Sequence, residues 1–164
     1  MTIWIRNITK DTLMDFDNDH KINLPMPEDE LRKLLGDDEW IVIDSPIGEE
    51  MIDILQLNDL VEKYGEERLC LLAQSFLLDE IMENDFIIID FDEETKEYCN
   101  GLGCFPDEWW KGYLMFQLGY VKFPFEYKDE MEDYVRFETL WTTAECEGWR
   151  EIKYNGNTYI VAMT

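Results

Sequence analysis

The sequence predicts an α+β fold, with small mixed sub-domains of antiparallel sheet and short helices in an elongated acidic molecule. Three observations predict it. Short apolar runs typical of strands alternate with helical patterns along the chain. An Asn155-Gly156 pair separates two alternating runs near the end, which predicts a C-terminal β-hairpin. Hydrophobic residues make up 46% of the 164 residues and aromatic residues 14%, enough to build packed cores.

The first part of the chain predicts a strand, a loop, a helix and a second strand. Ile3 and Ile5 belong to a strand over 2–8, and the polar, acidic stretch 9–23 predicts a loop. Pro27, three acidic residues and a leucine stripe predict a helix that ends at Gly36, because Pro suits the first helical position and carboxylates suit the positive end of the helix dipole. A strand follows over 40–43.

The rest of the chain is predicted to be mainly helical until the hairpin. Residues 57–84 predict two helical pieces broken near 64–65, with Asn58 as the N-cap. Residues 86–89 predict a short strand, and 107–118 and 129–141 predict two late helices. The hairpin strands are expected over 149–154 and 157–163. Weak boundaries near Gln56 and over 101–106 divide the chain into sub-domains 1–56, 57–104 and 105–164.

The charge is strongly unbalanced. The chain carries 38 acidic and 14 basic residues, a net charge of −24, spread over both halves. This excludes a basic face for nucleic acid and disfavours an anionic membrane surface. Solubility alone needs a net charge of about 2–8 in magnitude, so the excess indicates a strongly basic partner or one that normally binds a polyanion. A high-salt habitat is an alternative explanation, although the chain keeps bulky Ile, Phe and Trp residues.

Residues for catalysis or metal binding are sparse. The single histidine, His20, lies in an acidic stretch, and the acidic runs that begin at Asp15 and Asp90 lack the Gly and Glu that a calcium loop requires. Four cysteines lack the paired spacing of a zinc site and are expected to be free thiols: Cys70, Cys99, Cys104 and Cys146. We therefore expect that the protein is not an enzyme and that it binds no metal ion or cofactor. No apolar run suits a signal peptide or a membrane span, so a cytoplasmic protein is expected.

The charge suggests a different role. Duplex DNA carries one negative charge per about 1.7 Å of axis, so 24 charges match roughly 40 Å, or about a dozen base pairs. Carboxylates on short helices can then stand where phosphates stand in a cleft lined with Lys and Arg, since phosphate contacts carry no sequence information. We expect the DNA-like surface to comprise Asp37, Asp38, Glu49, Glu50, Asp53, Glu66, Glu67, Asp79, Glu80, Glu83, Asp92, Glu93, Glu94, Asp129, Glu130, Glu132 and Asp133.

A family resemblance points the same way. Segments 3–8, 24–36, 39–45 and 57–60 read IWIRNI, LPMPEDELRKLLG, EWIVIDS and LNDL, and this pattern resembles the ArdA family of antirestriction proteins. The resemblance implies a curved, multi-domain DNA mimic, usually a dimer, encoded by phages and mobile elements, that blocks type I restriction-modification enzymes. The chain departs from the family in its C-terminal half, where 116–122 lacks the Arg-Asp of the family's antirestriction segment.

Several function classes stay open at this stage. A relative directed at another defence protein, such as a CRISPR effector, would share the charge. An immunity protein would block one cognate basic nuclease toxin, and an acidic secretion chaperone would display an apolar groove. The many carboxylates also offer pairs for glycoside hydrolysis, but such abundance carries no information. The hypothesis we retain is a DNA-mimic inhibitor that occupies the basic DNA-binding cleft of a restriction or other defence protein.

Overall fold

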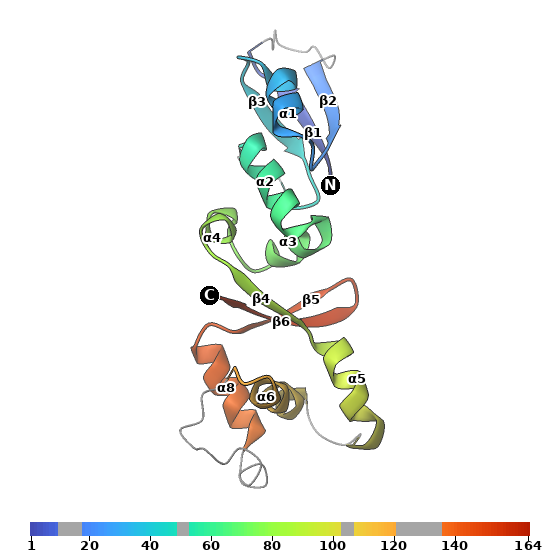
Figure 1. Ribbon diagram of the computed structural model, residues 1–164, viewed down its shortest axis with the longest axis vertical. Coiled ribbons are helices and arrows are strands. Elements are labelled where there is room, and N and C mark those ends of the chain that lie inside the picture. The colour runs from blue at the N-terminus through green and yellow to red at the C-terminus, as the bar shows by residue number, and fades with distance from the viewer. Residues whose placement is uncertain (10–17, 49–52, 103–106, 121–135) are drawn as a thin grey trace. The chain divides into compact units, whose positions relative to one another are not determined.

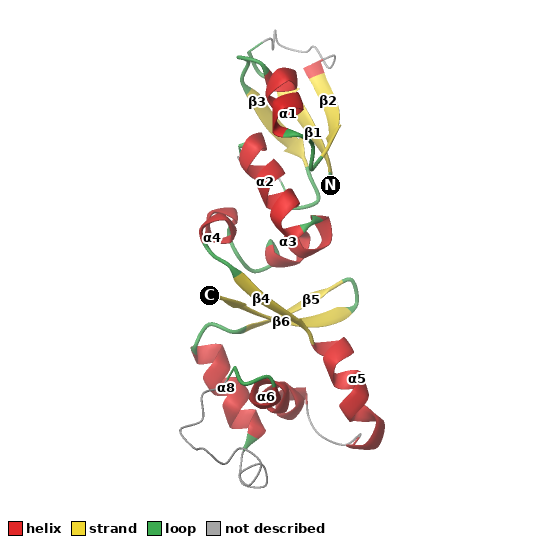
Figure 2. Ribbon diagram, in the orientation of Figure 1, coloured by secondary structure: helices red, strands yellow, loops and turns green. Residues whose placement is uncertain are grey.

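The computed structural model describes residues 1–9, 18–48, 53–102, 107–120 and 136–164, with the backbone alone over 97–102. It confirms the α+β class: helices combine with two three-stranded antiparallel sheets and a C-terminal hairpin (Figures 1 and 2). The chain divides into two compact units, Met1–Glu83 and Asn84–Thr164.

The N-terminal unit holds a sheet with strand order β2-β1-β3 and four helices among the described residues. Its elements are β1 (Thr2–Asn7), β2 (Asp19–Asn23), α1 (Glu28–Leu35), β3 (Trp40–Asp44), α2 (Ile54–Tyr64), α3 (Glu66–Leu72) and α4 (Leu78–Glu83). Ile3 and Ile5 of β1 are fully buried, and so is Leu31 of α1. In Figure 1, helix α1 lies over the sheet. Strand alternation therefore supplies one apolar face. Of the leucines of α1, Leu31 is buried, Leu35 is half-buried and Leu34 is exposed.

Strand β2 corrects the expectation of a loop over 9–23. Its sequence is polar, with Ile22 as the single buried residue, yet it pairs in antiparallel register with β1, Ile3 lying opposite Ile22. An edge strand needs only one inward apolar side chain to join a sheet, and its polar residues face solvent, so a hydrophobic pattern alone does not identify it.

The start of α2 differs from the prediction as well. Asp53, not Asn58, is the N-cap: its carboxylate accepts hydrogen bonds from the N–H groups of Leu55 at 2.8 Å and Gln56 at 3.2 Å. Asn58 lies inside the helix, is buried, and exchanges two hydrogen bonds with the backbone of Met26. The predicted break near 64–65 is confirmed, because Gly65 ends α2 with φ of 76°.

The C-terminal unit holds a sheet with strand order β4-β6-β5 and, among its described residues, three helices. Its elements are β4 (Phe86–Asp90), α5 (Phe91–Leu102), α6 (Asp107–Gln117), α8 (Phe137–Cys146), β5 (Arg150–Tyr154) and β6 (Asn157–Met163). Asn155 and Gly156 both have positive φ, 51° and 84°, as a type I′ hairpin turn requires.

Helices α6 and α8 pack closely in this unit. A side chain at Gly112 would begin 1.7 Å from the carbonyl oxygen of Phe137, so only glycine allows this approach. The core beside it is aromatic, with Trp110, Trp141 and Trp149 each at most 9% exposed.

Two further expectations need correction. Helix α5 was not predicted, although Asp90 accepts a hydrogen bond from the N–H of Glu93 at 3.0 Å and so opens it as an N-cap. The helix expected over 129–141 begins outside the described residues, and α8 continues beyond it to Cys146.

The three predicted sub-domains 1–56, 57–104 and 105–164 do not coincide with the two units. Strand β4 belongs to the predicted middle segment, but it pairs with β6 near the end of the chain, Ile89 lying opposite Ile160. A boundary between residues 104 and 105 would therefore separate two strands of one sheet. Helices α2, α3 and α4 join the N-terminal sheet in one unit instead.

Candidate acidic interaction surface

Five of the predicted carboxylates are exposed and form no ion pair or hydrogen bond with another side chain among the residues that the structure describes. They are Asp37, Glu67, Asp79, Glu83 and Glu94. Asp79 and Glu83 are four residues apart on α4, which places both carboxylates on one helix face. These five residues form what we call the exposed acidic set, and they are the carboxylates best placed to meet a basic partner.

Four other predicted carboxylates hold the fold together. Asp53 caps α2, and Glu80 accepts a hydrogen bond from the N–H of Leu77 at 2.8 Å, closing the first turn of α4. Asp92 accepts from the N–H of Thr158 at 2.6 Å, joining α5 to β6. Asp38 accepts from the side-chain amide of Asn7 at 2.8 Å. Their charge still contributes to the field, but their removal would also weaken local structure.

Two predicted carboxylates form ion pairs within the chain. Glu66 lies 2.9 Å from the amino group of Met1, and Glu93 pairs with Lys96 one turn along α5. The Glu93 carboxylate raises the pKa of Lys96 through a hydrogen bond and through its charge. Both carboxylates and Lys96 are at least half exposed, whereas Met1 is buried, and each pair reduces the local negative charge.

Six predicted residues lie outside the described part of the chain. They are Glu49, Glu50, Asp129, Glu130, Glu132 and Asp133.

The calcium-like run that begins at Asp15 also lies partly outside the described part, but its third carboxylate, Asp19, is placed. Arg6 donates to Asp19 through Nε at 2.6 Å and through Nη2 at 2.9 Å, and this hydrogen bonding lowers the pKa of the Asp19 carboxyl. Asp19 thus has a cation partner within the chain.

Acidic residues gather at the N-terminal first turns of the helices. The first turns of α1, α3, α4, α5, α6 and α8 all carry Asp or Glu, and the last turns of α3, α4, α5, α6 and α8 carry no basic residue. Each carboxylate beside the positive end of a helix dipole is stabilised by about 0.3–1 kcal/mol. This placement explains how the fold tolerates the charge, and it leaves many helix beginnings carrying fixed negative groups.

The structure also exposes carboxylates that the predicted set omitted, some in first turns and others inside a helix or at its end. They are exposed on α1, α2, α6 and the end of α8, and comprise Asp29, Glu30, Asp59, Glu62, Asp107, Glu108, Glu145 and Glu147. Their signal in the sequence was the polar side of each helical pattern, where solvent-facing positions fall between the buried leucines and tryptophans.

Both units share the charge. The N-terminal unit contains 21 acidic and seven basic residues, a net charge of −14, and the C-terminal unit contains 17 and seven, a net charge of −10. Each unit taken alone therefore presents a strong negative field.

Over the described ranges, no three His, Cys, Asp or Glu side chains gather in a way that would hold a metal ion. Within those same ranges no helix is both long and apolar enough to cross a membrane. Cys70 is buried and Cys146 is exposed, and neither forms a disulfide bond with another described residue. Compared with known proteins, the chain matches no family model, no curated protein and no solved structure.

Proposed function

We propose that this chain is a DNA-mimic inhibitor that occupies the basic DNA-binding cleft of a host defence enzyme in the bacterial cytoplasm, in the first place a type I restriction-modification complex. One observation carries the proposal: both units present exposed carboxylates at helix beginnings, with net charges of −14 and −10 and few cations to offset them. The resemblance of residues 3–60 to ArdA proteins selects the class of target.

The mechanism requires geometry and charge only. A cleft lined with Lys and Arg binds phosphates by position, and a carboxylate held on a helix end offers the same charge and the same acceptor atoms. Long-range attraction between the acidic protein and the basic cleft speeds association, and salt weakens it. Inhibition follows because the cleft holds either the mimic or DNA.

The exposed acidic set is the part of this surface that can contact a partner without breaking an ion pair or hydrogen bond to another described side chain. The N-terminal unit contains Asp37, Glu67, Asp79 and Glu83, and the C-terminal unit contains Glu94. Each exposed carboxylate contributes little alone because solvent screens it, so the proposal depends on their number.

The test is inhibition of purified enzymes by the purified chain. We expect DNA cleavage by a type I restriction-modification enzyme to be inhibited, with the inhibition overcome by excess duplex DNA of unrelated sequence. Inhibition confined to a CRISPR effector would redirect the proposal to that class, and neutralisation of one nuclease toxin alone would favour an immunity protein. Chemical turnover lost on a single carboxylate substitution would replace the proposal with an enzyme.

A matched pair of variants separates surface charge from structural charge. Substituting the exposed acidic set together by Asn or Gln should weaken inhibition strongly and reduce the salt dependence of binding, while each single substitution should have a small effect. The combined variant keeps Asp53, Glu80 and Asp92, so its fold should be retained, which circular dichroism would verify.

A further inference from the structure

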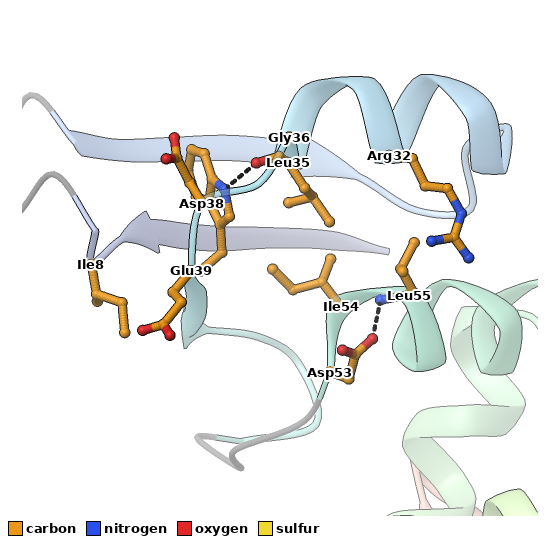
Figure 3. Close-up of a pocket in the computed structure, with 10 residues that line it drawn as sticks. Ile8, Arg32, Leu35, Gly36, Asp38, Glu39, Asp53, Ile54 and Leu55 are labelled. Carbon is orange, nitrogen blue, oxygen red and sulfur yellow. Dashed lines mark hydrogen bonds between the residues drawn. The ribbon is translucent and has the colours of Figure 1, made fainter.

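The register of the N-terminal sheet assigns each strand residue to one of two faces, because residues directly opposite one another in neighbouring strands point to the same side. Ile3 and Ile5 lie on the inner face and are fully buried. Trp40 lies opposite Asn7 on this face and donates its indole N–H to the carbonyl of Leu35 at 2.9 Å, beside an open cavity of about 470 Å³ that residues of α1, β3 and α2 line (Figure 3). The inner face therefore packs against the helices of the unit.

The outer face has an exposed tryptophan at its centre. Trp4 lies in the middle strand, with Lys21 of β2 directly opposite it on one side and Asp44 of β3 directly opposite it on the other. Trp4 is 41% exposed, although it belongs to the central strand of the sheet. Tryptophan combines a large apolar surface with one polar N–H and is enriched at protein interfaces. Its position therefore indicates a docking surface.

The charges of this face are balanced. In the next row, Arg6 lies between Asp19, to which it donates two hydrogen bonds, and the half-buried Ile41. Lys21 and Asp44 form no ion pair with one another or with any other residue that the structure describes. The paired residues of the outer face thus include two cations and two carboxylates, in a unit whose net charge is −14.

The order of the charges selects the partner. The row reads cation, tryptophan, carboxylate across the three strands, so it is complementary to itself when turned by a two-fold axis along β1. Lys21 of one copy then faces Asp44 of the other on both sides of Trp4. Two copies with a net charge of −24 each repel one another, and a charge-balanced face is where they can approach closely. A strongly basic partner would gain more from the acidic helix beginnings.

We propose that a second copy of this chain docks on the outer face, with Trp4 against Trp4 and Lys21 of each copy against Asp44 of the other. Three strands of five or six residues cover roughly 300 Å². This is less than the area of about 800 Å² per partner that stable complexes bury, so the dimer is weak, with a dissociation constant of about 0.1–1 mM. The inference does not depend on the proposed function.

The test measures self-association of the full chain without any defence enzyme. Sedimentation equilibrium over about 20 μM to 1 mM, in 0.3 M NaCl to screen the repulsion between copies, gives the dissociation constant. NMR spectra of the isotope-labelled chain over the same dilution series locate the interface. We expect concentration-dependent shifts at the indole N–H of Trp4 and the backbone N–H of Lys21, and none at the indole N–H of Trp40 on the inner face.

A matched pair of variants tests the tryptophan. Trp4→Gln should weaken dimerisation at least about tenfold, because both copies lose the side chain at the centre of the contact. Leu34→Gln, at a position of α1 that is 42% exposed and lies outside the outer face, should leave dimerisation unchanged. Urea denaturation of both variants verifies that they are folded.

Charge exchange tests the orientation. Lys21→Asp and Asp44→Lys should each weaken dimerisation by about fivefold, because like charges then face one another, although the two substitutions change the net charge in opposite directions. An equimolar mixture of the two variants should associate more tightly than either alone, since opposite charges meet again on both sides of Trp4. A chain that stays monomeric up to 1 mM, equal effects of Trp4→Gln and Leu34→Gln, or a mixture that associates no better than its components would overturn the proposal. None of these results bears on competition with DNA, so the proposed function is tested separately.

Discussion

Replacing Gly112 by alanine tests the packing that builds the C-terminal unit. The added Cβ would lie 1.7 Å from the carbonyl oxygen of Phe137 and 2.4 Å from its carbonyl carbon. Both atoms belong to the backbone of α8, so no side-chain rotation relieves the clash. Helices α6 and α8 would have to separate locally by about 1.5 Å to restore a normal contact.

The magnitude follows from two opposing effects. Overpacking costs typically about 1–3 kcal/mol, and a clash against backbone lies at or above the top of that range. Alanine recovers about 1 kcal/mol of helix propensity relative to glycine. We expect a net loss of about 2–3 kcal/mol in the free energy of unfolding, because the shift also loosens contacts of the buried Trp110 and Trp141.

Urea denaturation gives the free energy, and amide hydrogen exchange locates the change. Exchange should accelerate in α6, α8 and the sheet of the C-terminal unit. Thr142→Ala, at an exposed position of α8, serves as the control and should change the free energy by no more than about 0.5 kcal/mol. A Gly112→Ala variant as stable as the parent, or more stable, would refute the close approach of α6 and α8.

Substitutions at three positions test individual carboxylates. Asp53→Ala should cost about 1 kcal/mol in urea denaturation, because α2 loses its N-cap, whereas Asp53→Asn should be nearly neutral. Asp92→Ala should cost about 1–3 kcal/mol and speed amide exchange at Thr158, whose N–H loses its acceptor. Asp19→Asn should lower stability at neutral pH and match the parent in acid, measured as the free energy of unfolding against pH. Arg6 lowers the pKa of Asp19, so this stabilisation is present above the ordinary Asp pKa and is lost as pH falls through the lowered value. Unequal stabilities of the two proteins at low pH, an equal loss from Asp53→Asn, or unchanged exchange at Thr158 would contradict the respective assignment.

Much of the fold is readable from local patterns. The Asn155-Gly156 turn, the strands around it, the helix that ends at Gly36 and the break at Gly65 all follow from backbone requirements of single residues and from apolar periodicity. These features are local, so a single sequence is enough to predict them.

The misses have physical causes. Strand β2 is held by pairing with β1, and its sequence carries one buried apolar residue, so tertiary context decides its conformation. The division into two units depends on β4 meeting β6 some 70 residues later, a contact that no local pattern encodes. Asn58 was predicted as the N-cap because Asn is favoured at helix N-caps. Its side-chain amide instead forms two hydrogen bonds with the backbone of Met26.

The candidate surface was predicted as a set of clusters, and the structure separates their roles. Asp38, Asp53, Glu80 and Asp92 accept hydrogen bonds within the chain, and Glu66 and Glu93 form ion pairs. These assignments depend on which N–H or cation lies within reach after folding. The open cavity lined in part by Leu35, Trp40 and Ile54 was not predicted, because its lining comes from α1, β3 and α2.

A DNA mimic and duplex DNA must compete for one basic cleft. The most direct measurement is equilibrium displacement: labelled protein bound to a purified type I restriction-modification enzyme is titrated with duplex DNA at several salt concentrations. We expect mutually exclusive binding, and we expect the logarithm of the apparent affinity to fall linearly with the logarithm of the salt concentration. A ternary complex of enzyme, DNA and this protein, or affinity indifferent to salt, would contradict it.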